Sequence, residues 1–193
     1  TEYNLGDTIL FDVASNSRCT TVSSTCLETY VIDVNNRLGD ETVTLLPNPN
    51  EIYLTSNYYN YSSTLSTITN NWTVTTRPLL IEDILRIVSK DIVNSVLIRD
   101  NISDLIIGNL NYGTRINTEL NRAISYNGYY SFNNERFNFL MGSNCYWTFS
   151  QYNASNGFAV RIINQDKSKI YNEAKTSTCN IVPVVLADKD NLK

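Results

Sequence analysis

Cys145-Tyr146-Trp147-Thr148-Phe149 is a run of aromatic and β-forming residues, which favours an extended strand. A polar loop over residues 150–156 follows it, and residues 157–163 return to strand-forming side chains. A third run of this kind covers residues 181–186. The C-terminal region, residues 140–187, is therefore predicted to be a β-meander.

The N-terminal residues 1–49 are predicted to form a second antiparallel meander. Aromatic and β-branched residues dominate three short runs in this region. The runs cover residues 3–11, which contain a Gly6-Asp7 turn, residues 29–34 and residues 42–46. Residues 35–40 are expected to form a turn, and Pro47 and Pro49 end the meander because proline cannot donate to a β-ladder.

Between the two meanders the sequence changes character twice. Residues 50–76 are rich in Tyr, Ser, Thr and Asn without clear periodicity, which indicates a long polar loop region. From Pro78, apolar residues recur at spacings of three and four, as in an amphipathic helix that starts with proline in its first turn. A second helix is expected over residues 114–124, so that residues 77–125 form a helical region.

This order of elements predicts one domain over residues 1–193, since 193 residues are too few for two ordinary domains. Its fold class is α+β, with an antiparallel β-sheet and one or two helices between the meanders. The apolar stripe of the first helix is expected to pack on the sheet.

The four cysteines allow three pairings. We expect Cys19 to pair with Cys26 and Cys145 with Cys179, because these pairs join near neighbours within antiparallel elements. A zinc site is the alternative, but the chain has no histidine and no Cys-x-x-Cys pair. Disulfides favour an oxidising, extracellular compartment.

Charged residues make up only 18% of the chain, and its net charge is −4. The sequence contains no basic stripe, which argues against nucleic acid and anionic lipid as partners. Asn, Ser, Thr and Tyr supply the polarity instead, a composition that suits binding surfaces but also follows from an AT-rich genome. No run approaches the ~20 apolar residues of a membrane span, and the chain starts without a signal sequence. The protein is therefore either cytosolic or an exported product in mature or truncated form, and the cysteines favour export.

The absence of histidine excludes Ser-His-Asp and Cys-His catalysis. A catalytic carboxylate pair stays open, with candidates Glu51, Glu82, Asp83, Glu119, Glu135 and Asp166. No cofactor is expected, and calcium stays open as an alternative, because residues 188–191 resemble the opening of a calcium loop without its glycine and closing glutamate. Asn-x-Ser/Thr sequons begin at Asn60, Asn71, Asn101 and Asn153.

Exposed aromatic and amide side chains of two polar loops are the candidate ligand-binding residues. They are Tyr58, Tyr59, Tyr61 and Trp72 of residues 57–72, and Tyr152, Asn153 and Asn156 of residues 150–156. Trp147 lies in an apolar strand and is expected in the core.

Residues 146–160 and 181–186 resemble the Y-W-T-S and V-R-P-V endings of a large group of bacterial cell-surface and pilin-like proteins. The opening Tyr3-Asn4-Leu5-Gly6-Asp7 and residues 77–84 are similar to the corresponding segments of the same proteins. That group resembles the C-type-lectin-like superfamily. The resemblance implies a C-type-lectin-like fold, and many of these relatives carry a pilin-like or lipoprotein anchor before the domain.

We therefore expect a non-enzymatic extracellular binding or adhesion module, located on a bacterial surface or pilus. Its partner would be a host or environmental glycan or protein. The first alternative is a structural subunit of a pilus or surface layer that contacts neighbouring subunits. A more distant alternative is a carboxylate-dependent glycan-processing enzyme.

Overall fold

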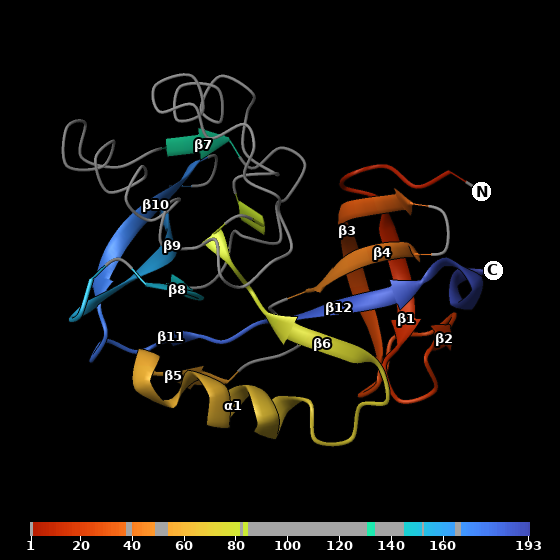
Figure 1. The fold of residues 1–193 in the computed structure, drawn as a ribbon, viewed down its shortest axis with the longest axis horizontal. Helices are drawn as coiled ribbons and strands as arrows, with labels where there is room; N and C mark the ends of the chain where they lie inside the picture. The colour runs from red at the N-terminus through yellow and green to blue at the C-terminus, as the bar shows by residue number, and fades with distance from the viewer. Residues whose placement is uncertain are drawn as a thin grey trace.

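A computed structural model describes residues 2–37, 40–48, 54–81, 83–84, 131–133, 145–151, 153–164 and 167–193. The described residues form two six-stranded sheets (Figure 1). The predicted α+β class is confirmed in its coarse form, since antiparallel sheet dominates and a short helix accompanies it. No helix within the described ranges is long and apolar enough to cross a membrane.

The first sheet contains the predicted N-terminal meander. Its order is β2-β1-β3-β4-β12-β6, and every neighbouring pair is antiparallel. The bounds are β1 Thr8–Asp12, β2 Ser17–Arg18, β3 Cys26–Arg37, β4 Asp40–Pro47, β6 Thr75–Pro78 and β12 Pro183–Asp188. The turn expected over residues 35–40 is shorter than predicted, because β3 and β4 stay paired as far as Arg37 and Asp40. The meander ends at Pro47, as expected.

The second sheet contains most of the C-terminal strands. Its order is β5-β11-β8-β9-β10-β7, antiparallel except for one parallel bridge between Asn180 of β11 and Tyr146 of β8. The bounds are β5 Thr55–Ser56, β7 Ser131–Asn133, β8 Cys145–Gln151, β9 Asn156–Asn164, β10 Lys167–Ala174 and β11 Cys179–Asn180. The sequence prediction missed β10.

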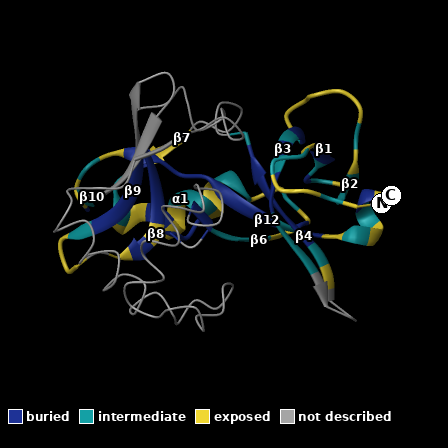
Figure 2. Ribbon diagram, turned by 90° about the horizontal axis from the view of Figure 1, so that it is seen from above, coloured by how far each residue is buried: buried dark blue, intermediate teal, exposed yellow. Residues whose placement is uncertain are grey.

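The last strand, β12, was predicted to belong to the C-terminal meander, and this prediction is wrong. The chain leaves β11 in the second sheet and enters β12, which lies between β4 and β6 of the first sheet. A central strand has neighbours on both edges and is covered on both faces, so its sequence is a nearly continuous run of apolar residues. Figure 2 shows β8, β9 and β12 coloured mostly as buried.

The prediction of a polar loop over residues 50–76 is wrong for its centre. A 3-10 turn, η1 Tyr58–Asn60, leads into α1 Tyr61–Ile68. Tyr61, Leu65 and Ile68 recur at helical spacing and face the core, while the Ser and Thr residues between them face solvent. This stripe is only three residues long, which is why the hydroxyl-rich composition concealed it.

The predicted helix after Pro78 starts later than expected. Pro78 is the last residue of β6, and Ile81, Asp83 and Ile84 have helical conformation. The Asp83 carboxylate accepts the Leu80 N–H at 2.8 Å, which caps this helix start. The rest of this helix and the helix predicted over residues 114–124 lie outside the described residues.

Two clusters of buried side chains form the core. The first lies in the sheet of β1, β3, β4 and β12 and includes Phe11, Val31 and Val185. The second lies under β8 and contains Trp147 and the Cys145–Cys179 pair. Ile68 of α1 packs against both clusters, so this helix connects the two cores.

Candidate functional site

The two candidate loops, which lie about ninety residues apart in the sequence, meet in the structure. The N–H of Tyr58 donates to the carbonyl of Lys175 at 2.9 Å, and the N–H of Lys175 donates to the carbonyl of Ser155 at 2.8 Å. The turn after β10 therefore lies between residues 57–61 and the β8–β9 turn. One surface can draw on all three segments.

Tyr58 is the centre of this contact, and its side chain packs against neighbouring rings instead of extending into solvent. Its ring stacks on Phe149 with centroids 5.8 Å apart and meets Trp147 edge-on at 5.5 Å. Its hydroxyl donates to the carbonyl of Phe149 at 2.7 Å. Burial raises the pKa of Tyr58 to about 12, so the hydroxyl keeps its proton at neutral pH.

Gly157 makes room for this packing. A Cβ atom at residue 157 would lie 2.8 Å from Cδ2 of Tyr58 and 3.1 Å from Cζ3 of Trp147. Both distances are shorter than van der Waals contact, so any larger side chain would displace a ring. The glycine at the start of β9 is thus required by the aromatic neighbours rather than by a turn.

Phe149 and Gln151 are the exposed side chains of β8. The pairing of β8 with β9 is irregular between Trp147 and Gln151, but contacts place the three side chains around one ring. Trp147 and Phe149 both contact the ring of Tyr58, and Gln151 is bonded to Lys175, whose ammonium lies over that ring. Trp147 is fully buried, whereas Phe149 is 37% exposed and Gln151 is exposed. Phe149 is held from below by Tyr58 and by Tyr61, whose ring centroid lies 5.0 Å away.

We name this region the Phe149 surface and define it by Tyr58, Tyr59, Phe149, Gln151 and Lys175. Tyr59 is 63% exposed and follows Tyr58 directly in the chain. The exposed members are an aromatic hydrocarbon, a phenol and an amide, so the described surface is neutral at its outer side. Large rigid aromatic rings beside amides are typical of binding surfaces, because they bury much area and lose little side-chain entropy.

Lys175 supplies a charge beneath this surface. Although it is a lysine, it is only 5% exposed. Its ammonium lies 4.8 Å above the Tyr58 ring centroid and donates to Oε1 of Gln151 at 2.8 Å. Burial lowers the pKa of Lys175. No carboxylate among the described residues pairs with it, so its partners there are a π-face and a neutral amide.

The β8–β9 turn is held by Asn153, one of its predicted ligand residues. Oδ1 of Asn153 accepts from the backbone N–H groups of Ser155 at 2.9 Å and Asn156 at 2.8 Å. The carbonyl oxygen of the Asn153 side chain is therefore occupied in an Asx-type turn. Asn153 is exposed, Asn156 is half-buried, and Tyr152 lies outside the described residues.

Two predicted site residues do not face solvent as expected. Tyr61 is fully buried, and its hydroxyl accepts the N–H of Leu79 at 3.2 Å. Burial raises the pKa of Tyr61. Trp72 is half-buried against the first core cluster. The prediction of an exposed platform is wrong for both, because each packs beside a core cluster that local sequence does not show.

Trp147 is in the core, as predicted. It is fully buried, and its indole N–H donates to the carbonyl of Ser56 at 2.9 Å. This bond satisfies the one polar atom of the side chain, which removes the cost of burying it.

Of the six carboxylate candidates, only Asp83 lies in the described part of the chain. Asp83 is 1% exposed and accepts from both terminal nitrogens of Arg77 at 2.7 Å. Such a bidentate pair orders the start of the helix and leaves the carboxylate no open side for catalysis. Glu51, Glu82, Glu119, Glu135 and Asp166 lie outside the described residues.

Both predicted disulfides are present. Cys19 pairs with Cys26, with Cα atoms 6.0 Å apart, and Cys145 pairs with Cys179 at 5.0 Å. All four thiols are used, which excludes the cysteine zinc site. Two disulfides fit a secreted domain.

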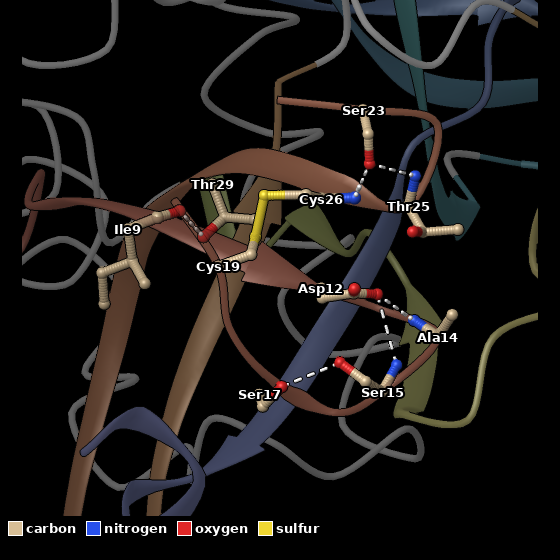
Figure 3. Close-up of a disulfide and its surroundings, with 10 residues drawn as sticks. All are labelled: Ile9, Asp12, Ala14, Ser15, Ser17, Cys19, Ser23, Thr25, Cys26 and Thr29. Carbon is tan, nitrogen blue, oxygen red and sulfur yellow. Dashed lines mark hydrogen bonds between the residues drawn. A yellow bond between two sulfur atoms is a disulfide. The ribbon is translucent and has the colours of Figure 1, made fainter. Parts of the chain in front are cut away.

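The Cys19–Cys26 bond closes a hydroxyl-rich loop beside β1 (Figure 3). The Asp12 carboxylate in this region accepts the N–H groups of Ala14 at 2.9 Å and Ser15 at 3.2 Å. Burial raises the pKa of Asp12, but these bonds and those of neighbouring hydroxyls together hold it below its usual value.

Residues 188–191, which resemble a calcium loop, form a 3-10 turn, η3 Lys189–Leu192. Asp188 caps it by accepting the N–H of Asp190 at 3.0 Å, and Asp190 pairs with Lys193 at 2.7 Å. Within the described ranges, no three acidic or cysteine side chains lie close enough together to hold a metal ion. Three sequon residues, Asn60, Asn71 and Asn153, are exposed, and Asn101 lies outside the described residues.

Phe149, Gln151 and Lys175 were not among the predicted site residues. Local pattern does not single out Phe149 or Gln151, because both follow a run of four buried residues in the same strand. Lys175 carries no local signal either, since its role depends on contacts with Gln151 and Tyr58.

Comparison with known protein families, curated proteins and solved structures finds no match to this chain.

Proposed function

We propose that this chain is a single-domain, non-enzymatic extracellular binding or adhesion module that contacts its ligand through the Phe149 surface. The observation that carries the proposal is the exposed Phe149 ring, held by the buried Tyr61 and by Tyr58. A ring that is already ordered before binding loses little entropy on binding, so its contact area converts efficiently into affinity. The cell-surface or pilus location and a C-type-lectin-like relationship belong to the same proposal and rest on the sequence motifs.

The disulfides and the neutral outer side of the surface support this function. Disulfides persist in oxidising compartments, where adhesion modules work. The Phe149 surface exposes no basic group that would attract nucleic acid, and its one lysine is buried. Asp83, the described carboxylate candidate, is held by Arg77, which supports a non-catalytic role.

The test compares Phe149→Ala with Leu5→Ala, because the two side chains are equally exposed at 37% and 38%. Beads coated with each variant are applied to a panel of immobilised glycans and extracellular-matrix proteins. We expect Phe149→Ala to lose about tenfold or more in affinity, as for a central aromatic contact. Leu5→Ala is expected to bind like the unchanged protein.

Equal binding by both variants would show that the Phe149 surface is not the contact site. The structural-subunit alternative predicts a different result, in which the purified protein self-associates in sedimentation and Phe149→Ala abolishes that association. The enzymatic alternative predicts shortened oligosaccharides after incubation, which mass spectrometry of the panel would detect.

A further inference from the structure

The Gln151 amide has a fixed orientation. The ammonium of Lys175 can only donate hydrogen bonds, so the atom that it contacts at 2.8 Å must be the amide oxygen. The two amide N–H groups then point away from Lys175. None of the hydrogen bonds among the described residues uses these two donors.

Lys175 is well placed to hold that orientation. Its backbone is tied on one side to Tyr58 and on the other to Ser155, and its ammonium lies over the Tyr58 ring. A buried ammonium without a described carboxylate partner depends on the amide oxygen for its hydrogen bonding, so rotation of the amide would cost it a partner. The Lys175 ammonium therefore keeps the two N–H donors of Gln151 directed away from itself.

The donors share a surface with the exposed ring. Gln151 is bonded to Lys175, the Lys175 ammonium lies 4.8 Å from the Tyr58 ring centroid, and that ring stacks on Phe149, so the amide and the exposed ring belong to one surface. A flat apolar face and a pair of N–H donors on one surface match a sugar ring, which offers C–H groups on one face and oxygen acceptors at its rim.

We propose that Gln151 is a specificity-determining donor for a neutral glycan whose sugar ring stacks on Phe149, and that Lys175 is the positioning residue that orients Gln151. The inference rests on the proposed binding function and assigns its ligand class. A neutral ligand fits better than an acidic one because the cation among the residues that define the Phe149 surface, Lys175, lies below it and is 5% exposed. A carboxylate on the ligand would lose its hydration without contacting an exposed cation on this surface.

The experiment is an NMR titration of the intact protein with methyl glucoside, methyl mannoside, methyl galactoside and N-acetylglucosamine at millimolar concentration, with glucuronic acid as the acidic probe. The signals observed are the side-chain NH₂ group of Gln151, the ring of Phe149 and the indole of Trp147. We expect at least one neutral sugar to shift the first two signals, while the buried indole shifts less.

Three variants separate the roles of the residues. Gln151→Glu keeps the shape and pairs with Lys175, so thermal stability is retained, but it removes both donors and should weaken binding about tenfold or more. Lys175→Met removes the orienting bond, so the Gln151 NH₂ signal should move even without sugar and binding should weaken. Asn71→Asp is the matched control, since Asn71 is an exposed amide at the end of α1.

Each other outcome overturns the inference. Shifts caused by glucuronic acid alone, and lost at high salt, would show an anion site. Unchanged binding by a folded Gln151→Glu protein would remove Gln151 from recognition. If no sugar shifts any signal while Phe149→Ala still loses binding to matrix proteins, the glycan assignment fails and the proposed function survives. Absence of binding in both assays would overturn both.

Discussion

Removing the two disulfides one at a time is expected to have unequal effects on stability. The compared variants are Cys145→Ala/Cys179→Ala and Cys19→Ala/Cys26→Ala. The first bond joins residues 34 positions apart and the second joins residues 7 positions apart. The loop-closure entropy that each bond removes from the unfolded chain then corresponds to about 3.8 kcal/mol for the first and about 2.4 kcal/mol for the second.

Burial increases the difference. Cys145 and Cys179 are 4% and 1% exposed and belong to the core cluster around Trp147. In the other pair Cys26 is also buried, at 3% exposed, but Cys19 is half-buried beside a polar loop. Loss of two buried sulfur atoms adds a packing cost of about 1 kcal/mol or more. A total near 5 kcal/mol is a large part of the ~5–15 kcal/mol that keeps a domain folded.

The assay is urea denaturation of the oxidised variants, followed by the free energy of unfolding in water. Intact mass after alkylation, with and without reduction, verifies that the remaining bond is formed. Equal losses for the two variants, or a larger loss for Cys19→Ala/Cys26→Ala, would refute the loop-length reasoning. Reaction of all four thiols before reduction would refute the disulfides and the extracellular location together.

The remaining predictions concern residues around the Phe149 surface. Gly157→Ala is expected to lower the free energy of unfolding by about 2 kcal/mol and to change the near-ultraviolet circular dichroism, because the new methyl group displaces Tyr58 or Trp147; an unchanged spectrum would contradict this packing. Tyr61→Phe should cost about 1–3 kcal/mol in thermal or urea unfolding, since it leaves the Leu79 N–H buried without its acceptor; a neutral result would mean that water replaces the hydroxyl. The pKa of Lys175 is lowered by burial, so the folded protein releases this proton before the unfolded chain does. The burial cost therefore declines as the pH rises from below the folded-state pKa of Lys175 toward 10.5. The stability of the unchanged protein relative to Lys175→Met should rise over that range in urea titrations. A pH-independent difference would show that Lys175 is solvated.

Part of the candidate site was predictable from composition. Tyr58, Tyr59 and Asn153 were identified from two polar loops, and the structure brings those loops together through Lys175. Tyr61 was assigned to the same surface because its neighbours are polar. A helix of eight residues places it inward instead, and only the position of the core below α1 decides which face is buried.

Phe149 is the opposite case, an exposed residue that the sequence analysis did not assign to the binding surface. An aromatic residue in an apolar strand is expected to be buried, and Trp147 two residues earlier is. The sheet face that covers Trp147 ends at Phe149, because Tyr58 and Tyr61 reach only one side of its ring. Where a packing layer ends is a property of the assembled elements, so local pattern cannot give it.

The sequence alone determined the strand-forming runs, the proline that ends β4 and the pairing of each cysteine with its nearest neighbour, because these depend on residues close together in the chain. The tertiary structure decided that β12 joins β4 and β6, that Tyr61 turns inward and that Lys175 lies under Gln151. These features depend on contacts between segments dozens of residues or more apart. Such contacts are selected by the total burial and hydrogen bonding of the whole fold, which no local window of sequence contains.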